Sequence, residues 1–156
     1  MASDIGISDG ARQAVVDILN TLLADEFLLY VKTRNYHWNV VGPQFHDLHK
    51  FFEAQYEKLD DVIDEVAERA RSLGGRAYGT LEEFRKAARL KEDPGAVPAA
   101  RDMIAALLAD HETVIRALRA DLETAIEKGD AGTGDFLTGL MEDHEKLAWM
   151  LRAHLK

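Results

Sequence analysis

Four long stretches of this chain repeat apolar residues at spacings of three and four, and this periodicity constrains the fold more than any other feature. The spacing is typical of helices that bury one face against their neighbours. Proline and glycine mark the breaks between the stretches. Helices are expected from Ser8 or Asp9 to about Asn39, from Pro43 to about Leu73, from Pro98 to Gly129, and from 132–134 to the C-terminus.

A shorter helix is expected in the connection between the second and third long helices. Thr80 and Glu83 stand at the spacing of a capping box, and Leu81 and Phe84 give the segment 80–86 an apolar edge. Long helices joined by short breaks and one long connection describe an all-α four-helix bundle with a crossover. Since the chain has 156 residues, we expect a single domain over 1–156, with 1–8 as a short N-terminal tail.

The composition narrows both the chemistry and the partners. The chain has no cysteine, so disulfides, zinc–thiolate sites and iron–sulfur clusters are excluded, and oxygen and imidazole ligands remain. The 28 acidic and 19 basic residues give a formal net charge of −9, which disfavours nucleic acid as a partner. Before Lys32 the only basic residue is Arg12, so the N-terminal segment is no basic DNA-binding arm.

The sequence gives no support for secretion or membrane insertion. No N-terminal basic region is followed by an apolar run, and no apolar run approaches the ~20 residues that span a bilayer. We therefore expect a cytoplasmic protein without a membrane partner.

Two histidines and three carboxylates stand at spacings that suit a shared metal site: His37, His49, Glu53, Asp64 and Glu68. On one helix the last four would lie at roughly 0°, 40°, 60° and 100°, along one stripe of the cylinder. About 16 Å of axial rise nevertheless separates His49 and Glu53 from the last two carboxylates, whereas a metal holds its ligands within about 2.0–2.6 Å. One copy of this helix therefore cannot close the site.

The usual di-iron site inside a four-helix bundle uses two Glu-x-x-His motifs. The chain contains none, because no glutamate stands three residues before any of its six histidines. An antiparallel two-fold pairing of the second helices would instead bring His49 and Glu53 of one chain opposite Asp64 and Glu68 of the other, twice per dimer. The sequence therefore predicts a metal site between subunits.

The segments Asn35–Glu53 and Asp60–Arg69 closely resemble the signature of the Dps-type miniferritins. The resemblance extends over nearly the whole chain and implies a ferritin-like bundle whose subunits build a dodecameric cage from two-fold dimers. It also implies a di-iron ferroxidase centre between two subunits. That centre would use His37 and His49 of one subunit, Asp64 and Glu68 of its mate, and a shared or bridging Glu53.

The resemblance further implies a function. Such cages oxidise Fe(II), preferably with hydrogen peroxide, and store the ferric mineral, which protects DNA and the cell from oxidative damage. Imidazole suits Fe(II) and carboxylates stabilise Fe(III), so the mixed ligand set favours oxidation. The alternatives are a DNA-compacting protein and a structural or immune-interacting cage with a degenerate site. The charge of −9 opposes the first, although association with the nucleoid stays open, and the intact ligand set opposes the second.

Several polar residues have two interpretations. Trp38 would take up an oxidising equivalent or fill the dimer interface. By the resemblance, Asp130 and Asp135 would line a three-fold pore that Glu142 could complete, whereas the alternative is that both aspartates cap the last helix.

The remaining histidines and one glutamate receive structural interpretations. His46 is expected to be solvated or to lie just outside the metal ligands. His111 and His144 lie on apolar stripes, which indicates hydrogen-bonded histidines in the core or at an interface. Glu26 is expected at an interface between subunits, because the Glu-x-x-His partners of a bundle site are missing.

Overall fold

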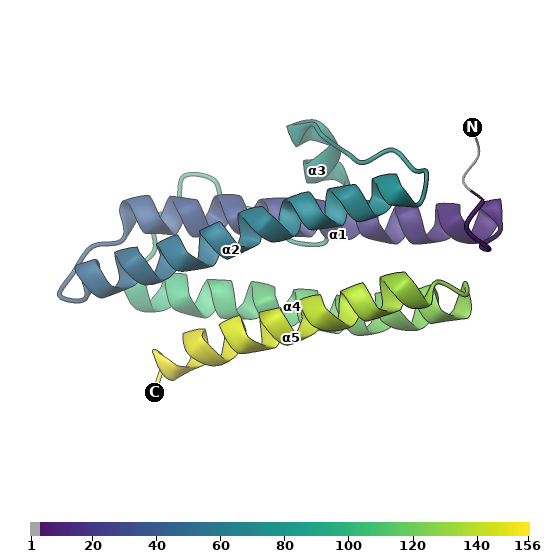
Figure 1. Ribbon diagram of the computed structural model, residues 1–156. Helices are drawn as coiled ribbons and strands as arrows, with labels where there is room; N and C mark the ends of the chain where they lie inside the picture. The colour runs from purple at the N-terminus through teal and green to yellow at the C-terminus, as the bar shows by residue number, and fades with distance from the viewer. Residues whose placement is uncertain (1–3) are drawn as a thin grey trace.

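The computed structural model describes residues 4–156, which form five helices and no strand. The helices are α1 (Asp9–Asn39), α2 (Phe45–Ser72), α3 (Leu81–Ala87), α4 (Ala100–Glu127) and α5 (Ala131–Ala153). α1 and α2 form one antiparallel pair, α4 and α5 form the other, and the short α3 packs against α1 on the outside of the bundle (Figure 1). The prediction of an all-α bundle with an extra short helix in the long connection is confirmed.

The helix starts follow local signals in the sequence. Ser8 caps α1, because its hydroxyl accepts a hydrogen bond from the Ala11 amide at 3.3 Å. Thr80 and Glu83 form the expected capping box at the start of α3. Both caps satisfy backbone N–H groups that the first helical turn leaves without partners.

The expected start of the second helix at Pro43 is wrong, because α2 begins at Phe45. Gly42 has a φ of +121°, a conformation that favours glycine, and its carbonyl oxygen accepts a hydrogen bond from the Phe45 amide at 3.0 Å. Pro43 therefore belongs to the turn between α1 and α2 rather than to the first turn of α2.

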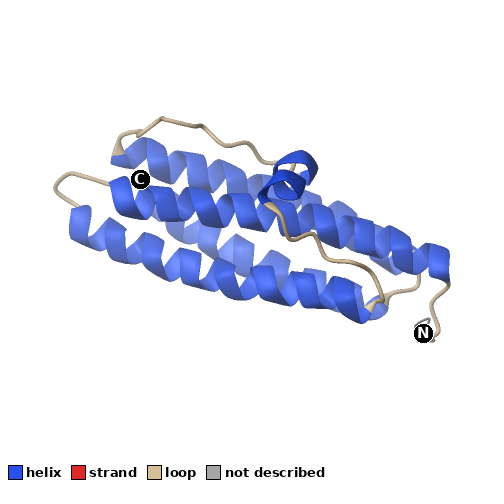
Figure 2. Cartoon of the chain, turned by 90° about the horizontal axis from the view of Figure 1, so that it is seen from above, coloured by secondary structure: helices blue, strands red, loops and turns tan. Residues whose placement is uncertain are grey.

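A continuous apolar core fills the space between the two helix pairs. Figure 2 shows the helices from above. Each large side chain buried in such a core stabilises the fold by about 1.5–3 kcal/mol. The fully buried side chains come from all four long helices and include Leu19, Leu22, Phe52, Leu59, Leu107, Leu118 and Leu137.

Ion pairs at the edges of the core connect elements that are distant in sequence. They fix the register between α1 and α4, between α2 and the start of α5, and between α1 and the segment after α3. The pairs are Lys32–Asp110 at 2.5 Å, Arg69–Asp130 at 2.9 Å and Arg89–Asp25 at 2.6 Å.

Residues 4–8 form an irregular segment before α1, and the rest of the expected tail, residues 1–3, lies outside the described part. The division into one domain and a tail over 1–8 stays a prediction. No helix among the described residues is long and apolar enough to cross a bilayer.

Candidate metal centre

His37 and His49, here called the histidine pair, lie side by side where α1 ends and α2 begins. The turn between the two helices stacks their rings with centroids 3.8 Å apart. Nδ1 of His37 lies 2.8 Å from the carbonyl oxygen of His49, and Nδ1 of His49 lies 2.9 Å from the carbonyl oxygen of His37. These reciprocal hydrogen bonds hold both rings to the backbone.

The same hydrogen bonds determine which ring nitrogens are free. A carbonyl oxygen can only accept, so each Nδ1 carries the proton and donates it. In the neutral imidazole, Nε2 then keeps its lone pair and can bind a metal. The histidine pair therefore offers two oriented Nε2 ligands.

Aromatic side chains support the histidine pair. The ring of Phe45 lies over His49 with centroids 5.1 Å apart, and Tyr56 meets His37 edge-on at 5.2 Å. His37 is only 6% exposed, and His49 is half-buried. Packing of this kind limits rotation of the rings, which keeps the Nε2 atoms in place.

Glu53 lies one helical turn after His49 and is half-buried. Its Oε2 accepts a hydrogen bond from Lys50 at 2.6 Å. This hydrogen bond lowers the pKa of Glu53 most, and the nearby histidines add to the effect. Glu53 is therefore an ionised carboxylate next to the histidine pair, the protonation state that a metal ligand requires.

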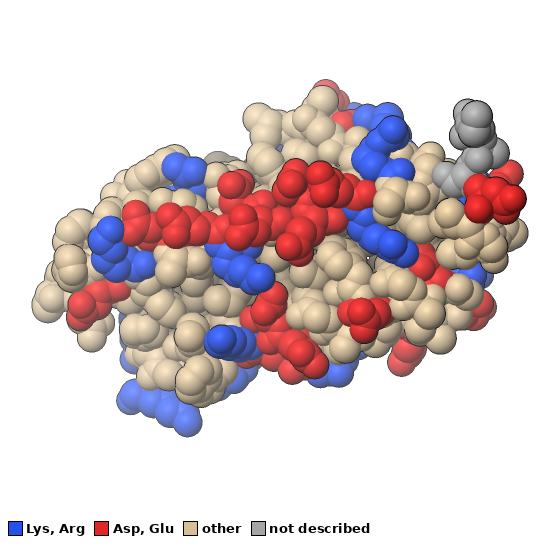
Figure 3. Space-filling view, viewed as in Figure 1, with Lys and Arg blue, Asp and Glu red and all other residues tan. Residues whose placement is uncertain are grey.

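Asp64 and Glu68 lie farther along α2, where Figure 3 shows a continuous acidic stripe. Both side chains are exposed. Within residues 4–156 of one chain, no three histidine or carboxylate side chains converge as a metal site. The structure thus stacks His37 on His49, with Glu53 one helical turn after His49, and leaves Asp64 and Glu68 farther along α2.

Trp38 follows the histidine pair on α1 and is 64% exposed. It belongs to an aromatic group that the sequence interpretation missed, in which the Arg34 guanidinium lies 5.1 Å from the Trp38 ring, 5.5 Å from Tyr30 and 4.7 Å from Tyr56. Arg34 also donates a hydrogen bond to the Tyr30 hydroxyl at 2.6 Å. The signal was present in the sequence, because residues 30, 34 and 38 are four apart and share a helix face.

A second histidine cluster, here called the buried cluster, lies in the middle of the bundle and consists of Glu26, His111 and His144. Nε2 of His144 lies 2.9 Å from Oε1 of Glu26, and its Nδ1 lies 2.9 Å from Nδ1 of His111. All three side chains are at most 1% exposed. His111 and His144 are hydrogen-bonded core histidines as predicted, but the interface position expected for Glu26 is wrong, because its carboxylate points into the core of its own chain.

Burial controls the charge of the buried cluster. Removal from water lowers the pKa of His111 well below its ordinary value, and the neighbouring His144 lowers it further. His111 is therefore neutral at pH 7. Its Nε2 and the Oε2 of Glu26 are buried without a hydrogen-bond partner among the described residues.

Asp130 caps α5, which is the structural role that the sequence offered as the alternative to a pore. Its carboxylate accepts a hydrogen bond from the Thr133 amide at 2.9 Å, which caps α5, and it pairs with Arg69 at 2.9 Å. The residue is buried, so its carboxylate is used within the chain. Asp135 and Glu142 are exposed on α5, and a pore lined by them stays a prediction.

Comparison with known proteins identifies the family. Residues 16–156 match the model of the ferritin-like domain. A crystal structure of a Dps protein from Vibrio cholerae O1 matches with a TM-score of 0.93 at 36% identity, covering 100% of this chain and 98% of that one. This chain belongs to the Dps-type miniferritins.

Other relatives support the same family assignment. This chain is 53% identical over 154 residues to an uncharacterized low temperature-induced protein of Nostoc sp. (strain PCC 7120), covering 98% of this chain and 86% of the relative. DNA protection during starvation protein 2 of Bacillus anthracis is 38% identical, with 92% and 98% of the two chains covered. DpsC from Streptomyces coelicolor matches with a TM-score of 0.97 at 28% identity over 100% of this chain and 91% of that one. The predicted family is confirmed.

Proposed function

We propose that this miniferritin is a ferroxidase and iron-storage protein that oxidises Fe(II) at di-iron sites between subunits. The histidine pair carries the proposal, because it offers two fixed Nε2 atoms to a metal. The Vibrio cholerae relative is described as a ferritin-like diiron-carboxylate protein, which supports iron as the metal. An antiparallel mate would supply Asp64 and Glu68, since at least about 16 Å of helix separates these two residues from Glu53, and about 22 Å or more separates them from His49, in the same chain.

Each ligand has a distinct part in the proposed reaction. His37 and His49 bind Fe(II), and the carboxylates of Asp64, Glu68 and Glu53 stabilise the more highly charged Fe(III). Hydrogen peroxide is the proposed oxidant: it takes one electron from each of two Fe(II) ions and two protons from solvent, and becomes two waters. Because both electrons go to one peroxide molecule, no hydroxyl radical is released.

The assembly follows from the same proposal. Two-fold dimers would build a dodecameric cage that holds the ferric mineral, and Asp135 would attract iron towards a three-fold pore. Trp38 would either take up an oxidising equivalent from the neighbouring site or fill the dimer interface. The cage would work in the cytoplasm, where association with the nucleoid stays open.

A rate measurement tests the ferroxidase function. Metal-free protein is mixed with Fe(II), peroxide or air is added separately, and formation of Fe(III) is followed for wild type, His49→Ala and Asp64→Ala. Both variants should be slower with either oxidant. The matched controls are His46→Ala and Asp61→Ala, which remove exposed side chains of the same types from the same helix. Equal rates in wild type, His49→Ala and Asp64→Ala would contradict the proposal.

A mixing experiment tests whether the site is shared between subunits. His49→Ala and Asp64→Ala subunits are disassembled together and reassembled as a mixture. Dimers with one chain of each type would contain one intact site and one doubly damaged site, so part of the activity should return. No recovery, despite reassembly seen by size, would show that each chain needs both halves itself.

Direct DNA binding is the alternative that the charge opposes. The chain has a net charge of −9, and Arg12 is the only basic residue before Lys32. We expect no gel shift of duplex DNA at physiological salt without bridging cations. A retarded complex that salt disrupts would overturn this expectation.

A further inference from the structure

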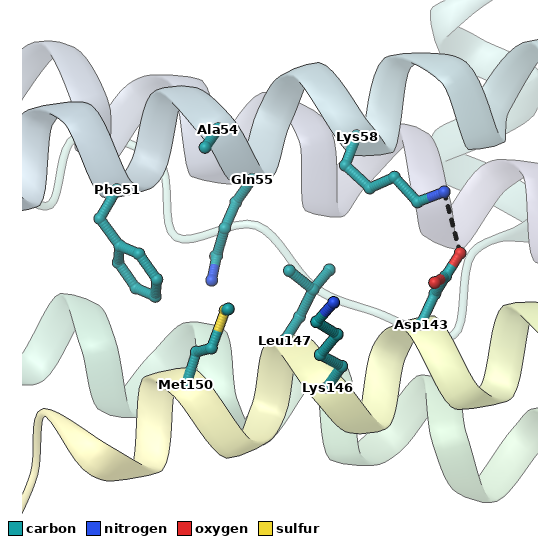
Figure 4. A pocket seen from close by; sticks show the side chains of 8 residues that line it. All are labelled: Phe51, Ala54, Gln55, Lys58, Asp143, Lys146, Leu147 and Met150. Atoms are coloured by element: carbon teal, nitrogen blue, oxygen red, sulfur yellow. Dashed lines mark ion pairs between the residues drawn. The ribbon is translucent and has the colours of Figure 1, made fainter.

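A pocket between α2 and α5 lies apart from the histidine pair and is not used by the proposed reaction. Its volume is about 320 Å³, near the lower end of the ~300–1,000 Å³ typical of small-molecule sites. Phe51 from α2 and Leu147 and Met150 from α5 form its apolar walls (Figure 4). The pocket is therefore large enough for one aromatic ring with small substituents.

Gln55 provides a buried polar group in this pocket. The residue is 1% exposed, and its side chain points from α2 towards α5 between Phe51 and Leu147 (Figure 4). Neither Nε2 nor Oε1 of its amide has a hydrogen-bond partner among residues 4–156. A buried polar atom without a partner destabilises the fold, so a molecule that hydrogen-bonds both amide atoms would remove this penalty.

The two lysines of the pocket differ in whether a carboxylate neutralises their charge. Lys58 pairs with Asp143 at 2.9 Å, which closes one end of the pocket with a neutral pair (Figure 4). Lys146 also lines the pocket, but no carboxylate within residues 4–156 pairs with it. One net positive charge therefore remains at the rim, and it favours an anion.

Taken together, these features specify a ligand class. We propose that the pocket between α2 and α5 binds a small aromatic hydroxy acid. Its ring packs against Phe51 and near the sulfur of Met150, an arrangement that is favourable for aromatic groups. Because both amide atoms of Gln55 are enclosed in the free chain, its side chain turns towards the ligand on binding. The hydroxyl then donates to Oε1 of Gln55, and the carboxylate accepts from Nε2 of Gln55 and pairs with Lys146.

Binding of salicylate to the assembled, iron-free protein tests the proposal. Saturation-transfer NMR should show the aromatic protons in contact with protein, and titration calorimetry should give up to one site per chain. Gln55→Leu should weaken binding by about tenfold, because it removes both hydrogen bonds. This variant is expected to fold, since an apolar side chain of similar size replaces an unpartnered amide.

The charge contribution is tested separately. Lys146→Gln should weaken salicylate binding by about fivefold, and 2-hydroxybenzyl alcohol, which lacks the carboxylate, should bind wild type about as weakly. Lys91→Gln is the matched control, because Lys91 is exposed and lies outside the pocket. Absence of saturable binding by wild type, or equal affinity in wild type, Gln55→Leu and Lys146→Gln, would overturn the proposal.

Discussion

The histidine pair and the buried cluster use the same side-chain chemistry for opposite purposes. In the histidine pair each ring bonds a backbone carbonyl through Nδ1, and neither Nε2 atom bonds another residue within 4–156. In the buried cluster, His144 uses both nitrogens, one towards Glu26 and one towards His111. The first arrangement can accept a ligand from outside, whereas the second connects three helices of one chain.

The comparison shows that the number of potential ligands does not identify a metal site. The buried cluster has two histidines and a carboxylate within hydrogen-bonding distance of one another, yet they do not converge on a common point as metal ligands. In the proposed site the histidine pair supplies only half of the ligands, and it lies at the end of a helix pair. The unpartnered atoms of the buried cluster are enclosed in the core, so accessibility as well as a free lone pair distinguishes the two groups.

The largest expected difference between substitutions in the histidine pair and in the buried cluster is in the rate of iron oxidation. His37→Ala should slow oxidation by at least about 100-fold, because loss of an oriented ligand is more severe than the loss of its supporting hydrogen bonds. Stability should fall by about 2 kcal/mol, because the variant loses one hydrogen bond and part of the packing of a buried ring. Stopped-flow absorbance measures the rate, and urea unfolding measures the stability.

The buried cluster supplies the control for that experiment. A conservative change there, Glu26→Gln, keeps a hydrogen-bond acceptor for His144 and should leave the oxidation rate of the folded protein near that of wild type. If Glu26→Gln slowed oxidation as much as His37→Ala does, the core cluster would belong to the iron chemistry and the comparison would fail.

The second-largest expected effect is on the free energy of unfolding of variants in the buried cluster. His144→Ala should lower the free energy of unfolding by about 3 kcal/mol, because it leaves the carboxylate of Glu26 buried without its partner. Adding Glu26→Leu should recover part of this loss, since it removes the unpaired polar group. Denaturant midpoints of wild type, the single variant and the double variant measure both changes.

The recovery of stability in the double variant decides whether Glu26 and His144 are energetically coupled. If the double variant were less stable than His144→Ala by the full cost of an independent core substitution, the two residues would not be coupled. The cluster would then be two separate core side chains rather than one hydrogen-bonded unit.

The smallest effect is on the pH dependence of unfolding. Burial, and then His144, hold the pKa of His111 well below its ordinary value of 6.5. Below pH 6.5 the unfolded chain therefore binds a proton at this residue that the folded chain does not, so acid reduces stability. The expected contribution at pH 5.5 is about 1 kcal/mol.

His111→Gln tests this contribution, because glutamine does not titrate. The difference in stability between pH 7.5 and pH 5.5 should be smaller in the variant than in wild type. An unchanged difference would mean that His111 takes up its proton equally well in the folded chain.

Most of the fold could be predicted from local signals. The capping residue Ser8, the capping box at Thr80 and Glu83 and the three-and-four spacing of apolar residues all act within one or two helical turns. The start of α2 was misplaced because proline suits both the first turn of a helix and the turn before it. Only the left-handed conformation of Gly42 distinguishes the two.

The candidate site was less accessible, because its geometry depends on packing between helices. Spacing along the chain identified His37 and His49, but no local rule predicts that each Nδ1 bonds the other residue's carbonyl oxygen. The same limit explains the error at Glu26, whose partner His144 is 118 positions away. Side chains of α1 and α5 meet only when the two helix pairs pack.

The reciprocal hydrogen bonds of the histidine pair would also couple the proposed metal binding to the rigidity of the bundle. They join the end of α1 to the beginning of α2, so the groups that orient the two Nε2 atoms are the same groups that close this hairpin. An ion bound there stabilises the closed hairpin over any open form by RT ln(1 + [L]/Kd). Iron loading should therefore slow hydrogen exchange of the backbone amides around residues 37–49. Hydrogen exchange in the turn between α1 and α2 would then report how fully the site is occupied.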